Sequence, residues 1–309
     1  MNKRAFSTVQ ILLAASVFLP ASSWAEAPLS GLPPVRLNVE LISVETRYYP
    51  SLGLDDPTPG TAEETARITP RPIHMNVALP WRVRTATSLF TVGFGYERLG
   101  LELDGWAPDQ PFPYGPFHSV QLPLAYARTL RDPRWGARFF LTPGVSSDFH
   151  DTGWRGFRVQ GGALFERKNP GGALSFGLVL INDYGAPRVL PAVAWAGRVA
   201  DKQTVVVRLP VLLSWSYQAS PVWEFGAAAR VSGGNYAIGR PDIFADKQLK
   251  YSAGTVGPFV RRTFGKWSLN LESGYAFLHT LEVTARKHQF RDYDLDRSAF
   301  LSVGIRRTL

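Results

Sequence analysis

The residues from Trp267 to Val283 alternate without interruption between apolar residues at most odd positions and polar or small residues at most even positions. This is a period of two over seventeen residues. A strand of a water-soluble sandwich usually has about five or six residues, whereas a tilted strand needs about nine to eleven to cross bilayer hydrocarbon. The segment therefore predicts a membrane-spanning strand with its odd-numbered residues facing lipid.

The N-terminus has the layout of a secretory signal. Lys3 and Arg4 precede the apolar run 11–19, and small residues lead to a cleavage position after Ala25. The apolar run is shorter than the roughly twenty residues that a spanning helix requires, which argues against a retained anchor. We expect a signal peptide at 1–25, an N-terminal lead at 26–34 and a barrel at 35–309.

Charge and composition narrow the possible partners. The formal net charge of +9 falls to +7 when Lys3 and Arg4 leave with the signal. The remaining Lys and Arg residues are scattered, which argues against nucleic acid and favours outer-membrane lipid and lipopolysaccharide or an anionic solute. The chain has no cysteine, so it has no disulfide, thiolate nucleophile or thiolate metal site. No later segment has eighteen consecutive apolar residues.

Further alternating segments predict an all-β fold, a single transmembrane antiparallel up-and-down β-barrel. Residues 204–217 keep one phase across Pro210, and because proline is poorly tolerated inside a paired strand, we expect two short strands there. The count is then fourteen strands, or twelve if pieces are fused. An even number places both termini in the periplasm. Expected short turns are 131–134, 169–172, 200–202, 218–221 and 265–266; expected longer loops are 49–64, 104–117, 233–247 and 284–297.

Three local patterns refine this prediction. The apolar phase slips between Leu41 and Ile42, as a β-bulge would require, and slips again before Leu99. The closing strand ends at the apolar residue Leu309, which resembles the signal for the outer-membrane assembly machinery although Phe is usual there. Aromatic residues near strand ends predict interfacial girdles: Tyr48, Tyr49, Trp81, Trp135, Trp154, Trp215, Trp223 and Trp267.

The segments 190–195, 205–217 and 223–236 form a series of motifs. They comprise a strand following proline, a short strand ending at Leu209-Pro210, a short strand ending at Tyr217, and Gly233-Gly234-Asn235-Tyr236. This series resembles an uncharacterised family of bacterial outer-membrane β-barrel proteins. The resemblance covers roughly the C-terminal half and implies a barrel domain, with no established activity or catalytic residues.

No group of residues has the pattern of a catalytic, cofactor or metal site. Ser146, Ser147, Asp148 and His150 lie close in sequence, but adjacent strand residues point to opposite faces, so a solvated loop is the better interpretation. His279 falls on the apolar phase and is expected at the membrane interface. We expect no cofactor, and an outer-membrane lipid hydrolase is the alternative.

The polar phase of the strands predicts the lumen, since charges on a lipid face are costly. Its members are Arg158, Gln160, Glu166, Arg208, Glu224, Arg230, Asn270, Glu272 and Glu282. These charges either pair inside a filled barrel or line an aqueous path. We expect an outer-membrane passive pore or small-solute transporter; the alternatives are a structural or surface-interaction barrel and a lipid-modifying enzyme.

Overall fold

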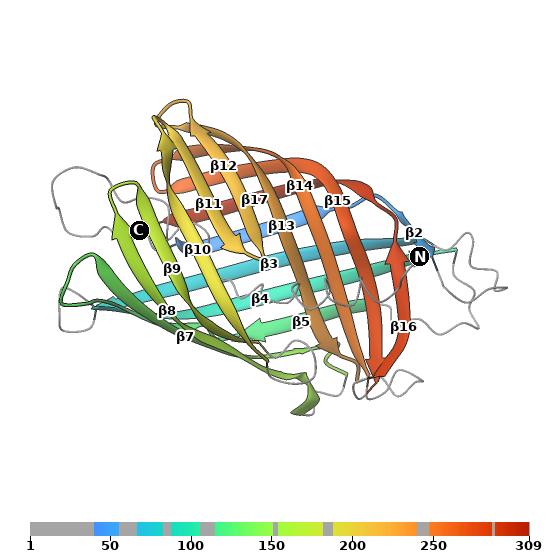
Figure 1. Ribbon diagram of the computed structural model, residues 1–309. Coiled ribbons are helices and arrows are strands. Elements are labelled where there is room, and N and C mark those ends of the chain that lie inside the picture. The colour runs from blue at the N-terminus through green and yellow to red at the C-terminus, as the bar shows by residue number, and fades with distance from the viewer. Residues whose placement is uncertain are drawn as a thin grey trace, which may run out of the picture.

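The computed structural model describes residues 40–55, 67–82, 88–105, 115–150, 154–181, 188–239, 247–285 and 288–308. The expected signal at 1–25 and lead at 26–34 lie outside the described residues. The described part is all-β, with one antiparallel sheet closed by pairing of its first and last strands (Figure 1). The strands are β1 (Glu40–Tyr48), β2 (Leu52–Asp55), β3 (Arg67–Arg82), β4 (Ser88–Asp104), β5 (Gly115–Gln121), β6 (Leu124–Thr129), β7 (Trp135–Ser147), β8 (Phe157–Asn169), β9 (Gly172–Ile181), β10 (Arg188–Ala200), β11 (Gln203–Leu209), β12 (Leu212–Gln218), β13 (Trp223–Ala237), β14 (Gln248–Phe264), β15 (Trp267–Ala285), β16 (His288–Leu295) and β17 (Ser298–Thr308).

Some of these seventeen segments share one position in the barrel wall, so the wall has fourteen strand positions, which confirms the expected number. Strands β5 and β6 share one position because both pair with β4 and β7. In the same way β1 and β2 both pair with β3, and β16 and β17 both pair with β15. The expected split at Pro210 is also confirmed. Its turn is closed by the Val211 amide, which donates to the Arg208 carbonyl at 2.7 Å.

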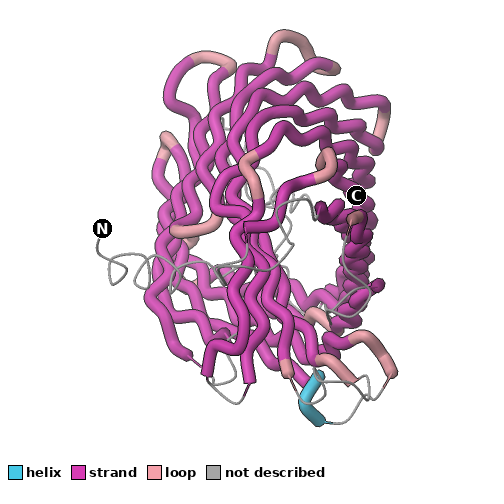
Figure 2. The backbone as a smooth tube through the Cα atoms, turned by 90° about the vertical axis from the view of Figure 1, so that its right-hand side faces the viewer, coloured by secondary structure: helices cyan, strands magenta, loops and turns pink. Residues whose placement is uncertain are grey.

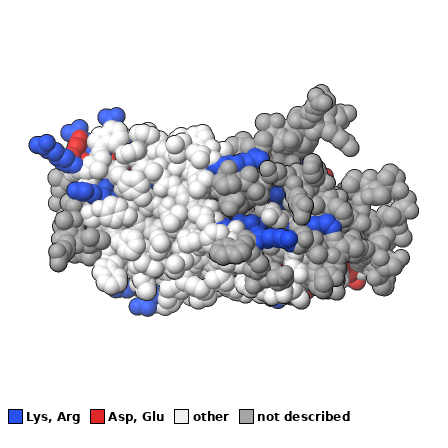
Figure 3. Space-filling view, turned by 90° about the horizontal axis from the view of Figure 1, so that it is seen from below, with Lys and Arg blue, Asp and Glu red and all other residues white. Residues whose placement is uncertain are grey.

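Over much of the barrel, apolar side chains face outward. Leu79 is 66% exposed, and Phe139, Leu213 and Leu271 are each about half exposed on their strands. On the face drawn in Figure 3, a broad band without charged side chains separates Lys and Arg residues near the two ends. Exposed apolar strands in a closed barrel match a lipid environment, where no edge is left unpaired. The protein is a bacterial outer-membrane β-barrel. No helix among the described residues is long and apolar enough to span a membrane.

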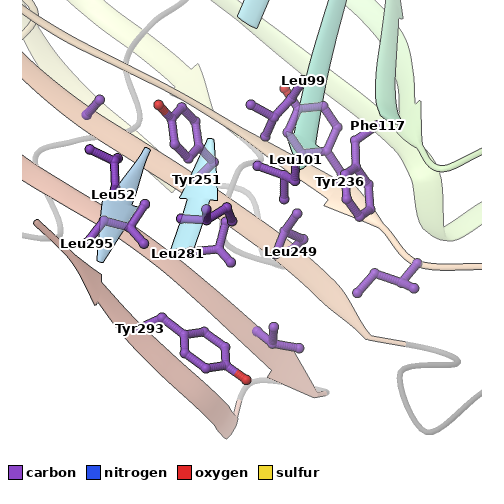
Figure 4. Packing of buried hydrophobic residues seen from close by; sticks show 14 residues of the cluster. Leu52, Leu99, Leu101, Phe117, Tyr236, Leu249, Tyr251, Leu281, Tyr293 and Leu295 are labelled. Carbon is purple, nitrogen blue, oxygen red and sulfur yellow. The ribbon is translucent and has the colours of Figure 1, made fainter. Parts of the chain in front are cut away.

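A buried apolar cluster lies inside the barrel at the end that carries the longer loops, with members from β2 to β5 and from β13 to β16. We call this end the long-loop end and the opposite end the short-turn end. We call this cluster the cap core (Figure 4). Its fourteen members are at most 6% exposed. They are Leu52, Ile68, Leu99, Leu101, Phe117, Tyr236, Ile238, Leu249, Tyr251, Ala253, Leu281, Val283, Tyr293 and Leu295.

The expected alternation of β15 is correct only up to Phe277. Leu271 and Tyr275 are exposed, but Leu281 and Val283 are fully buried in the cap core, although all four share one parity. The cause is a bulge at Leu278, which has φ 52° where the register with β14 shifts. A one-residue slip exchanges the two faces of a strand. Leu281 and Val283 therefore do not face lipid.

Strand β4 makes the same exchange without a bulge. Its register with β3 is continuous, so the slip before Leu99 is not a bulge as we expected. Phe94 points outward and Leu99 inward because the apolar residues themselves change parity between them. The bulge expected near Leu41 is confirmed by a register shift between Glu40 and Ile42.

All four expected longer loops contain strand residues. Strand β5 begins at Gly115, inside the loop expected at 104–117. Strand β13 continues to Ala237, inside the loop expected at 233–247. Strand β16 lies inside the loop expected at 284–297, and β2 lies inside the loop expected at 49–64. These segments carry inward residues of the cap core, such as Tyr236, Tyr293 and Leu52. Their backbone groups are paired because the buried cap provides no water for them.

Strand β13 changes its neighbour along its length. Its pairing with β12 runs from Glu224 to Arg230, and at Ala237 it lies parallel to Ser147 of β7. The Asp148 amide donates to the Ala237 carbonyl at 3.1 Å, which ties the two strands together. Figure 2 shows the strands as one wall around a central space, with the short helix η3 (Trp154–Gly156) at its edge.

Candidate solute cavity

A cavity of about 420 Å³ lies inside the barrel, below the cap core. It extends from Arg47 and Tyr236, next to the cap core, to Leu89 and Ala127 near the short-turn end. Its wall consists of inward residues from strands whose outward residues are apolar, as the alternation of a strand requires. The cavity is therefore the interior of the membrane-spanning part.

The structure separates the nine predicted lumen residues into those that line the cavity and those that do not. Arg158, Gln160, Arg208 and Arg230 line the cavity. The others lie outside its lining, in ion pairs or packed positions: Glu166 lies near Lys168, Glu224 pairs with Arg261, and Asn270 and Glu272 are almost fully buried. Glu282 pairs with Lys250 and, beyond the bulge, no longer shares the inward face of Glu272.

Three arginines that line the cavity were not among the predicted residues: Arg47, Arg138 and Arg306. Arg138 precedes the exposed Phe139, so its inward phase was visible in the sequence. The same signal marks Arg47, which precedes the exposed Tyr48. Arg306 follows Ile305 on the closing strand. All three could have been found by extending the lumen phase to every strand.

The cavity wall carries more positive than negative charge. Six arginines line it, Arg47, Arg138, Arg158, Arg208, Arg230 and Arg306, against three glutamates, Glu40, Glu45 and Glu97. This is a formal excess of three positive charges with His74 neutral, or two when the nearby Glu272 is included. Clustered cations in a confined space raise the local concentration of anions.

Ion pairs hold much of this wall in place. Arg230 lies 3.0 Å from Glu272, whose side chain is 1% exposed. Arg47 lies 3.1 Å from Glu45, and outside the lining Arg261 donates to Glu224 at 2.8 Å. The two alternatives from the sequence thus coexist at Arg230, which both pairs and lines the cavity. A guanidinium held by a buried carboxylate is a fixed positive group with a defined direction.

A layer of polar contacts separates the cavity from the cap core. The Tyr236 hydroxyl donates to Glu97 at 2.7 Å, and the Tyr251 hydroxyl lies 2.6 Å from His279 Nε2. Arg47 donates to the Tyr49 hydroxyl at 3.4 Å. Tyr49 and His279 are thus buried inside the barrel, with ring centroids 4.8 Å apart, and do not lie at a membrane interface as we expected.

The segment around His150 stabilises the end of β7. The hydroxyl of Ser146 donates to that of Ser119, and the Ser147 hydroxyl accepts from the Phe149 amide. Asp148 Oδ1 accepts from the Gly239 amide at 2.9 Å and so strengthens the junction between β7 and the chain after β13. These contacts do not form the Ser-His-Asp chain that acyl transfer requires. Among the described residues no His, Asp or Glu cluster could hold a metal ion.

Residues 103–308 match a family described as "Domain of unknown function (DUF6268)". The chain belongs to this family. The match covers the segments on which the resemblance to an uncharacterised outer-membrane barrel family was based. No curated protein matches the sequence.

Several solved outer-membrane proteins are similar to the DUF6268 chain in structure. An outer membrane channel from Pseudomonas putida F1 has 12% identity and a TM-score of 0.43, with 94% of this chain and 99% of that chain covered. The Pseudomonas putida toluene transporter TodX has 7% identity and a TM-score of 0.32, covering 86% and 88%. A mutant of the Rh. blastica porin has 10% identity and a TM-score of 0.24, covering 87% and 99%.

Proposed function

We propose that this protein is an outer-membrane channel that takes small anionic solutes into its arginine-rich cavity. The observation that carries the proposal is the set of six arginines that line one cavity inside a membrane barrel. In this arrangement the long-loop end faces the exterior, both termini lie in the periplasm, and the apolar belt contacts outer-membrane lipid and lipopolysaccharide.

The cap core argues for a selective channel over a general passive pore. A straight aqueous path would have to cross fourteen packed side chains that are at most 6% exposed. Water and ions are excluded from such an interior, because a close-packed core has few voids as large as a water molecule. We therefore expect slow, anion-preferring passage and no large steady conductance.

The test is uptake by proteoliposomes that contain the folded barrel. Acetate should enter faster than methylammonium, a cation of similar size, because only the anion is attracted by the wall. The double variant Arg138→Gln/Arg208→Gln should lose most of this preference, and Arg128→Gln, outside the cavity lining, is the control. Equal uptake of both ions, or a large non-selective conductance, would contradict the proposal. Fatty-acid release without uptake would favour an enzyme, and neither activity would favour a structural barrel.

A further inference from the structure

The barrel wall is shorter between β10 and β13 than elsewhere. Strands β11 and β12 have seven residues each, whereas β10 has thirteen and β13 has fifteen. The pairing of β10 with β11 begins at Val193, so 188–192 lie beyond the hairpin. The pairing of β12 with β13 ends at Arg230, and the Val231 amide still donates to the Val211 carbonyl of the turn at 3.0 Å, so 232–237 lie beyond the hairpin. Figure 1 shows β11 and β12 ending part-way along their neighbours.

This shortening leaves an opening with a defined frame. Its lower edge is the turn at Pro210 and Val211, and its sides are β10 and β13. Two strands separate β10 from β13 at the lower edge, so three spacings of about 4.8 Å hold them about 14 Å apart. At the top the opening is bounded where Ala237 of β13 joins Ser147 of β7. The junction keeps β13 from closing onto β10.

The opening leads into the arginine-rich cavity. Leu190 and Ala192 of β10, Pro210 and Val211 of the turn, and Val231 and Gly233 of β13 all line that same cavity. These residues are apolar or small. On the outer side Val189 and Leu209, next to this frame, are each 62% exposed and belong to the apolar surface of the barrel. The frame is thus continuous with lipid outside and with the cavity inside.

Two arginines lie directly inside the lower edge. Leu212 is the register partner of Arg208 on one side and of Arg230 on the other, so both arginines line the cavity within one or two residues of the turn. If a molecule enters the opening while its apolar part still lies in the lipid, its polar end reaches these guanidinium groups. Guanidinium groups suit carboxylates, which they can bind through two parallel hydrogen bonds.

We propose that this opening is a lateral portal, through which an amphipathic monoanion with one apolar chain and one carboxylate passes between membrane and cavity. The inference rests on the proposed function for the identity of the cavity, and it adds the route and the solute class. The cap core gives the reason for a side route, since its buried apolar side chains lie at the long-loop end of the barrel. The portal needs no movement of that core.

The absence of native cysteine allows a direct test of the route. A bimane label on Ala192→Cys reports the portal, and a label on Ala125→Cys is the matched control. Ala125 lines the same cavity but lies on β6, which pairs with strands on both sides. In vesicles of phosphatidylcholine with brominated acyl chains, the bimane at 192 should lose several-fold more fluorescence than the bimane at 125. Equal losses would overturn the portal. Val211→Cys gives a second reporter if Ala192→Cys does not fold.

The solute class is tested in vesicles of unbrominated lipid. Brominated decanoate should quench the bimane at 192 more effectively than brominated decylamine, by about fivefold if the charge attraction is worth roughly 1 kcal/mol. In Arg208→Gln the quenching by decanoate and by decylamine should become nearly equal, whereas Arg208→Lys should keep the preference for decanoate. Equal quenching by acid and amine in the unsubstituted barrel would overturn the carboxylate class. Quenching by brominated phospholipid alone, with no effect of decanoate, would identify membrane lipid as the occupant and also overturn it.

Acetate uptake by the same vesicles separates the two proposals. Charge-dependent quenching at 192 without acetate uptake would support the portal and contradict the proposed channel for small hydrophilic anions. Acetate uptake with equal quenching at 192 and 125 would support the channel and overturn the portal. Each result therefore contradicts one proposal and supports the other.

Discussion

In the part of the barrel below the Leu278 bulge, β15 points Leu271 outward and Glu272 inward; above the bulge it points Leu281 inward. We call the lower part the membrane zone and the upper part, which contains the cap core, the cap. The same strands therefore cross two environments. In lipid, apolar side chains are stable on the outer face of a strand. At the long-loop end, where water surrounds the barrel, they are stable on the inner face.

The two strands that show this exchange reach it by different means. In β4 the sequence moves its apolar residues from even to odd positions while the register stays continuous. In β15 the apolar residues stay at odd positions, and the bulge at Leu278 exchanges the inward and outward faces of the strand. The comparison teaches that the face of a β residue depends on parity and on the local register together.

The largest effect should come from placing a charge in the cap core. Leu281→Asp should destabilise the barrel by about 5 kcal/mol, because the carboxylate would be buried among apolar side chains without a partner. Thr280→Asp is the matched control, since Thr280 lies on the opposite face. Urea unfolding from lipid vesicles measures both. If Thr280→Asp cost as much as Leu281→Asp, the assigned inversion in β15 would be wrong.

A loss of about 3 to 5 kcal/mol should follow when the interior ion pair of the membrane zone is broken. Glu272→Gln would leave Arg230 without the carboxylate 3.0 Å away. The double variant Glu272→Gln/Arg230→Gln should recover much of the lost stability, because no charge is then stranded. No recovery in a double-mutant cycle of unfolding free energies would show that the pair does not stabilise this wall.

On the outer surface of the membrane zone, Leu271→Arg should cost about 2 to 4 kcal/mol, since a cation near the bilayer midplane loses its water. Phe264→Arg, at the short-turn end of β14, should cost only about 0 to 1 kcal/mol because the head groups are close. The comparison uses unfolding from vesicles. Equal costs at the two positions would contradict the assigned depth of the membrane zone.

The smallest effect is expected where the cap joins β7. Asp148→Ala removes the acceptor of the Gly239 amide and should cost about 1 to 3 kcal/mol. Hydrogen exchange should increase at the Gly239 amide and along the end of β13. His150→Ala is the control, because the His150 side chain is 57% exposed. Unchanged exchange in Asp148→Ala would mean that the junction does not depend on this carboxylate.

The sequence by itself determined the class of fold and the number of strands. Period-two alternation requires two unlike faces, and the length of the segments requires a membrane. Pro210 required a break because proline cannot donate to a strand ladder, and with that break the count was fourteen strands, or twelve if pieces were fused. The inward phase at Arg158, Arg208 and Arg230 was also visible, because an arginine beside outward apolar neighbours is costly on a lipid face.

Only the tertiary structure decided what each face contacts. Apolar residues face lipid in one zone and a protein core in the other, and the alternation is identical in both. The Leu278 bulge left no trace in the parity of β15, so the burial of Leu281 and His279 could not be predicted from it. The opening beside β11 and β12 depends on where β13 leaves one neighbour and joins β7, which is a contact between segments far apart in sequence.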